Sequence, residues 1–124
     1  MATVAASARA EMNGQGWSYT WSPLTAANAD GAPVPVPGRR GDTTVAIYGT
    51  FNTGSVAIQG TLATAEEILA DTATWFPVTD PQGNAIAKTA AAIETITEAC
   101  THLRPLMSGA GTDSITVRIY GRGQ

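Results

Sequence analysis

The chain has 124 residues, a formal net charge of −3 and 14 % charged residues, where an ordinary soluble domain has roughly 25 %. This length suits one domain with one core. The negative charge argues against a nucleic-acid partner, because phosphate binding requires a basic patch. The single cysteine excludes an intrachain disulfide and a thiolate metal cluster. So few charges indicate that part of the surface is covered by other subunits.

The N-terminal residues lack both a charged start and an apolar core, so they do not form a secretion signal. No apolar run approaches the roughly 20 residues that a membrane helix needs. We therefore expect the chain to be made and to fold in a cytoplasm, with no membrane partner. Residues 1–16 are rich in Ala, Ser and Gly and have no regular apolar face. We predict a flexible or partner-ordered arm there and a single domain over residues 17–124.

The first predicted strand carries three aromatic residues on one face. Trp17, Tyr19 and Trp21 alternate with Ser18 and Thr20, which is the period of a β-strand. Their face either caps the core or meets a partner. We prefer packing in the core or in an interface to a sugar-stacking platform built from Trp17 and Trp21.

A proline-rich segment follows. Pro33, Pro35 and Pro37 cannot donate to a sheet ladder, so the segment is predicted to be extended and to lie at a sheet edge or on the surface. Arg39 and Arg40 come next, and we expect them to meet an acidic partner surface or to stay solvated.

Residues 43–62 read as a β-hairpin around which the chain is organised. One face of its first arm holds Val45 and Ile47, and one face of its second arm holds Val56, Ile58 and Leu62. The connector 52–54 predicts a three-residue loop with Gly54 at positive φ. Such a hairpin predicts an antiparallel β-sandwich.

The rest of the chain predicts one short helix and further strands. Thr64 and Glu67 have capping-box spacing, which predicts a helix or helical loop over residues 64–70. A strand over 74–78, a turn over 80–83, and strands over 92–98, 101–107 and 114–120 follow. For 90–107 we prefer two strands to a helix, although the alanines favour a helix.

The candidate chemistry is sparse. Cys100 and His102, two residues apart on a strand, would share a face as a nucleophile and a base do. No third group orients them, and we prefer a packed cysteine beside a surface or interface histidine. Glu66 and Glu67 suit a helix start better than a carboxylate pair. We therefore predict no catalytic residue, no metal site and no cofactor.

Several blocks in order carry a family resemblance, which covers roughly residues 17–120. They are Trp21-Ser22-Pro23-Leu24, Gly31-Ala32-Pro33-Val34, Tyr48-Gly49-Thr50-Phe51, Val56-Ala57-Ile58-Gln59-Gly60, Trp75 with Thr79-Asp80-Pro81-Gln82-Gly83-Asn84-Ala85, and Leu103-Arg104-Pro105. The chain resembles small β-sandwich structural proteins of tailed bacteriophages, among them head decoration (cement) proteins. It departs from them between Gly60 and Trp75, where they tend to have a short turn.

The resemblance implies a jelly-roll-like sandwich, without catalysis or cofactor, that binds the outside of an assembled capsid. The expected function is a non-enzymatic decoration protein that stabilises contacts between major capsid protein subunits. We expect a homo-oligomer, a dimer before a trimer, on the capsid exterior of a virion assembled in the host cytoplasm. The residues expected at interfaces are Trp17, Tyr19, Trp21, Arg39 and Arg40. The alternative is a tail-fibre or baseplate module that binds a host glycan or another virion protein.

Overall fold

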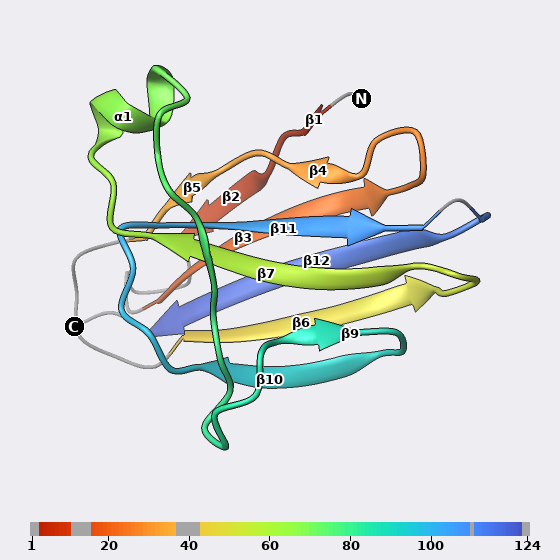
Figure 1. The fold of residues 1–124 in the computed structure, drawn as a ribbon. Coiled ribbons are helices and arrows are strands. Elements are labelled where there is room, and N and C mark those ends of the chain that lie inside the picture. The colour runs from red at the N-terminus through yellow and green to blue at the C-terminus, as the bar shows by residue number, and fades with distance from the viewer. Residues whose placement is uncertain (1–2, 11–15, 37–42, 110, 123–124) are drawn as a thin grey trace.

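The computed structural model describes residues 3–10, 16–36, 43–109 and 111–122, and over these residues the chain is the predicted all-β sandwich with one short helix (Figure 1). The five-stranded sheet has the order β10 (Ala92–Ile96), β6 (Thr43–Thr50), β12 (Ser114–Arg122), β3 (Gly16–Leu24) and β2 (Ser7–Ala10). The second sheet has the order β1 (Thr3–Val4), β4 (Asp30–Gly31), β11 (His102–Ser108), β7 (Ser55–Thr61) and β8 (Phe76–Pro77). In addition, β5 (Val34–Pro35) pairs with β11 and β9 (Ala87–Lys88) pairs with β7.

The core lies between the two sheets and is built from alternating side chains. On β12, Ile115, Val117 and Ile119 are completely buried, while Arg118 is exposed. The predicted inward residues of β6 and β7 are buried as well, namely Val45, Ile47, Val56 and Ile58. These alternations were predicted correctly because the side chains of a strand point to opposite faces in turn.

The predicted hairpin over residues 43–62 is wrong, although both of its strands exist. β6 pairs with β10 and β12, whereas β7 pairs with β11, β8 and β9, so the two strands belong to different sheets. An alternating pattern indicates that one face of a strand is buried, but it does not identify the strand's hydrogen-bonded neighbour. Two consecutive strands can therefore lie in opposite sheets, with their apolar faces toward the same core. Leu62 is 74 % exposed, because β7 ends at Thr61 and the chain then leaves the sheet.

Gly54 in the connector also differs from its prediction. The glycines with positive φ are Gly49, Gly83 and Gly109 among the described residues. Gly54 is needed for space, because a Cβ there would lie 2.8 Å from Cγ of Asp113.

The N-terminal segment is paired with its own chain over the described residues 3–10. β1 lies parallel to β4, and β2 extends the five-stranded sheet beyond β3. Val4 and Ala6 pack against the core. A sheet edge offers unpaired backbone groups, so a strand can join it with few apolar side chains. Such pairing leaves no signal in the side-chain composition, and the composition therefore predicted a flexible or partner-ordered arm. Residues 11–15 lie outside the described residues.

The remaining elements largely follow the predictions. Two strands, β10 and β11, occupy the region that the alanines made ambiguous. The helix α1 (Ala65–Leu69) begins with the predicted capping box between Thr64 and Glu67. The expected strand over 74–78 is a strand only at Phe76–Pro77. The turn after it is closed by a 2.9 Å hydrogen bond from the Gly83 amide to the Asp80 carbonyl. As predicted, the proline-rich segment is extended at the edge of its sheet at β5, while Pro37 lies outside the described residues.

Candidate protein-binding surfaces

The aromatic residues of β3 face the core. Trp21 has no exposed surface, and its Nε1 donates a 2.9 Å hydrogen bond to the Ala32 carbonyl. Trp17 and Tyr19 are half-buried, and their ring planes are tilted by 58°. Trp21 therefore cannot contact a partner, and it cannot form a sugar platform with Trp17. Sequence reasoning placed it at an interface because an alternating aromatic face looks the same inside a sandwich and outside it. Arg39 and Arg40 lie outside the described residues.

The outer face of the five-stranded sheet carries little charge over β10, β6, β3 and the part of β12 that ends at Tyr120. We use the name threonine face for a set of exposed and half-buried side chains on this part of the sheet, namely Thr20, Thr44, Ala46, Tyr48, Ile93, Thr95, Thr116, Arg118 and Tyr120. Arg118 is the one charged residue of this set, and its Nε donates to Oγ1 of Thr20 at 3.1 Å.

Three large side chains on the threonine face stand in solvent. Ile93 is 70 % exposed, Tyr48 41 % and Tyr120 39 %. Protein interfaces are depleted of charged residues and enriched in tyrosine. The threonine face therefore has the composition of a contact surface, and the sequence already contained the signal in the outward positions of β6, β10 and β12.

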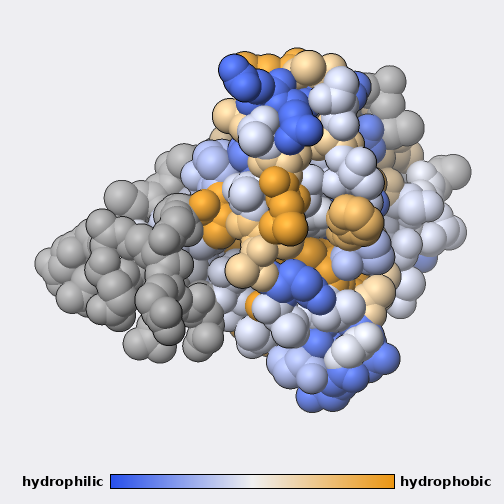
Figure 2. All heavy atoms as spheres, turned by 60° about the vertical axis from the view of Figure 1, so that its left-hand side comes forward, coloured by the Kyte–Doolittle hydropathy of each residue, from blue (hydrophilic) through white to orange (hydrophobic). Residues whose placement is uncertain are grey.

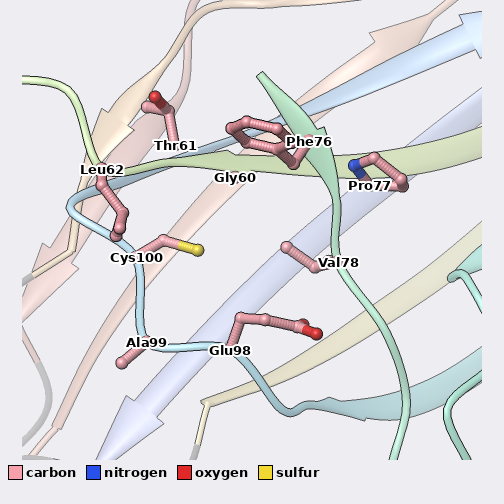
Figure 3. A pocket seen from close by; sticks show the side chains of 9 residues that line it. All are labelled: Gly60, Thr61, Leu62, Phe76, Pro77, Val78, Glu98, Ala99 and Cys100. Carbon is pink, nitrogen blue, oxygen red and sulfur yellow. The ribbon is translucent and has the colours of Figure 1, made fainter. Parts of the chain in front are cut away.

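A second candidate surface lies at one end of the other sheet. A hollow of about 380 Å³ is lined by residues from three segments: Gly60, Thr61 and Leu62; Phe76, Pro77 and Val78; and Glu98, Ala99 and Cys100 (Figure 3). Most of these residues are apolar, and Figure 3 shows the Cys100 thiol pointing into the hollow toward Val78. A Cβ at position 60 would overlap the Cys100 sulfur and lie 2.9 Å from a methyl group of Val78. Glycine at position 60 therefore leaves the space that the Cys100 sulfur occupies.

The rim of this hollow is acidic. The two carboxylate oxygens of Glu98 accept hydrogen bonds from the Thr79 amide at 2.7 Å and the Thr79 hydroxyl at 2.5 Å. Partial burial acts to raise the pKa of Glu98, but these hydrogen bonds outweigh it and the pKa lies below its ordinary value. A shallower hollow that shares Thr61, Leu62 and Phe76 adjoins it and includes Glu67.

Cys100 precedes β11, which begins at His102, so the two residues do not share a strand face as predicted for a nucleophile and a base. Burial, and then the charge of Glu98, raises the pKa of the Cys100 thiol, whereas a nucleophilic cysteine needs a lowered one. Burial lowers the pKa of His102, and its Nδ1 lies 3.1 Å from the Thr101 hydroxyl. Within the described part of the chain, no three His, Cys, Asp or Glu residues are grouped to bind a metal. No described helix is long and apolar enough to span a membrane.

Asp113 is a structural residue that the sequence analysis missed. It is 2 % exposed, and its Oδ1 accepts hydrogen bonds from the backbone amides of Asn52 at 2.5 Å and Gly54 at 2.9 Å. Its Oδ2 has no partner among the described residues. The Asn52 hydrogen bond lowers the pKa of this carboxyl, against the effect of burial, and Gly54 adds to the lowering. Asp113 thus connects the loop between β6 and β7 to the start of β12. In the sequence Asp113 stands in a glycine-rich turn, and that position gives no indication of this contact.

No family model matches the chain, and neither the curated proteins nor the solved structures contain a match to it.

Proposed function

We propose that the protein is a non-enzymatic capsid decoration protein of a tailed bacteriophage. It binds the outer surface of the assembled capsid and stabilises contacts between major capsid protein subunits. The observation that carries this proposal is the threonine face, a set of described side chains in which Arg118 is the one charged residue and Ile93, Tyr48 and Tyr120 are exposed. The block order that resembles cement proteins supplies the class of partner.

The physics of a repeated shell fits such a surface. A face that buries apolar and hydroxyl groups binds modestly in one copy, and contact with two or more capsid subunits at once multiplies the affinity by avidity. A homo-oligomer on the capsid exterior, a dimer before a trimer, provides that multiplicity. This role requires neither a cofactor nor a catalytic group.

Co-sedimentation with capsids tests the proposal. The purified chain is mixed with expanded capsids of the phage that encodes it, and the pelleted fraction is measured against concentration. We expect saturation at a fixed number of copies per capsid subunit. Ile93→Ser should weaken binding by roughly tenfold, because burying most of an isoleucine side chain contributes about 1.5 kcal/mol.

The matched control is Leu69→Ser, which replaces an equally apolar side chain that is 89 % exposed on α1, away from the threonine face. This variant should pellet like the unchanged protein. Absence of saturable pelleting would refute the proposal, and so would equal losses from the two substitutions. Pelleting with tail or baseplate particles in place of capsids would favour the tail-fibre or baseplate alternative.

A further inference from the structure

The hollow beside Cys100 has two large apolar side chains standing at its mouth. Leu62 is 74 % exposed and Phe76 is 59 % exposed. Figure 2, which shows this end of the molecule, has hydrophobic residues gathered in its middle with hydrophilic residues above and below them. A small molecule inside the hollow would leave the outward sides of Leu62 and Phe76 in water. A protein that inserts one side chain and rests on the rim would cover the interior and both rim residues.

The size of the hollow suits one large side chain. Its volume of about 380 Å³ lies at the lower end of the range for ligand sites, roughly 300 to 1,000 Å³. Gly60 and Val78, which are both buried, line it without filling it. An aromatic ring is therefore a suitable anchor, and buried aromatic anchors contribute most of the energy at protein interfaces.

Among the described residues, the lining of this hollow and of the adjoining one carries negative charge and no positive charge. Neither this hollow nor the adjoining one has a Lys or Arg among its lining residues, while Glu98 lines the first and Glu67 the second. The helix α1 above them has two acidic residues in its first turn and no basic residue in its last. Arg104 lines neither hollow and keeps its positive charge, and its guanidinium is held 4.1 Å from the Trp75 ring centroid and donates to Oε1 of Gln59.

From these observations we propose that the hollow is the docking site for a segment of another protein, in which an aromatic side chain is followed directly by Lys or Arg. The aromatic ring enters between Phe76, Val78 and Cys100. The Lys or Arg side chain that follows it lies on the side of the hollow where the carboxylates of Glu98 and Glu67 are. A second copy of this chain would bring its own net charge of −3 toward an acidic rim, so charge complementarity selects a basic partner. The site is separate from the threonine face, and the inference holds for whatever larger assembly the protein joins.

The test uses the full ¹⁵N-labelled chain and a capped peptide, acetyl-Gly-Phe-Arg-Gly-amide, titrated to about 10 mM because a four-residue ligand binds with a Kd near 1 mM. We expect saturable amide shifts confined to residues 60–62, 76–78 and 98–100. The Phe-to-Ala peptide should not saturate. The Arg-to-Glu peptide should bind at least about fivefold more weakly at low salt, and added salt should narrow that difference.

Substitutions on the chain complete the test. Leu62→Ser and Phe76→Ser should each weaken peptide binding about fivefold or more, and both side chains are exposed enough for the fold to survive. Leu69→Ser is again the matched control, since Leu69 is exposed and apolar but does not line the hollow. Retention of the remaining amide shifts shows that each variant is folded.

Four results would overturn the inference. The first is the absence of saturable shifts, and the second is equal binding of the Arg and Glu peptides. The third is tighter binding of neutral indole than of the peptide, which would make the hollow a site for an apolar small molecule. The fourth is concentration-dependent self-association in sedimentation that Leu62→Ser abolishes, which would identify a second copy as the occupant. None of these measurements involves a capsid, so the inference and the decoration function can fail separately.

Discussion

Replacing Trp21 with phenylalanine separates a core role for the β3 aromatics from a surface role. Trp21 is completely buried and its indole N–H donates to the Ala32 carbonyl. Phenylalanine keeps an aromatic ring in the same place but removes the fused ring and the donor. The structure therefore predicts a loss of stability with no direct effect on partner binding.

The expected loss is the sum of three contributions. The missing ring leaves a void of roughly 40 Å³, which costs about 1 kcal/mol at roughly 24 cal/mol per Å³. The apolar atoms removed contribute about 1 kcal/mol less burial. The Ala32 carbonyl loses its donor at a cost of about 1 kcal/mol. Together these amount to about 3 kcal/mol, or roughly 12 °C in Tm for a chain of this size.

Urea unfolding followed by circular dichroism measures this loss without relying on tryptophan fluorescence. The matched control is Trp75→Phe, because Trp75 is half-buried and lies under the Arg104 guanidinium. The control should lose less than about 1 kcal/mol. The reasoning is refuted if Trp21→Phe loses no more stability than the control, or if it abolishes capsid pelleting at unchanged stability.

Two further predictions follow from the perturbed titrating groups. Because the folded pKa of Asp113 is lowered, its contribution to stability is present above the ordinary carboxyl pKa and is lost as the pH falls through the folded value. Tm should therefore fall more steeply between about pH 5 and about pH 2 for the unchanged protein than for Asp113→Asn, and parallel curves would contradict this. Because the Cys100 pKa is raised, iodoacetamide should alkylate this thiol more slowly at neutral pH than a cysteine in an unstructured peptide. Equal rates would count against the placement of the thiol.

The buried faces of the strands were predictable because they depend on local periodicity. Ile115, Val117 and Ile119 could be placed in the core from alternation alone, and the helix start at Thr64 from the reach of its hydroxyl to the amide of Glu67. Both are decided by residues within a few positions of one another. Local chemistry of this kind is readable from the sequence.

Strand partners and candidate surfaces depend on residues far apart in the chain. Nothing in residues 43–62 indicates that β6 pairs with β12 while β7 pairs with β11. The hollow is assembled from three separate segments around Gly60, and Asp113 reaches back about 60 residues to the amides of Asn52 and Gly54. Such sites appear only after the sheets are assembled.

The central position of β12 in the five-stranded sheet has a consequence for synthesis. β12 lies between β6 and β3, and these two strands do not pair with each other. While a ribosome is still adding residues before Ser114, the two strands have no common neighbour, and the backbone groups that pair with β12 remain without that partner. Closure of this sheet must await the C-terminal strand, which makes folding depend on contacts between distant parts of the chain. A premature stop codon ahead of Ser114 would therefore divide the sheet into separate ribbons instead of shortening it by one edge.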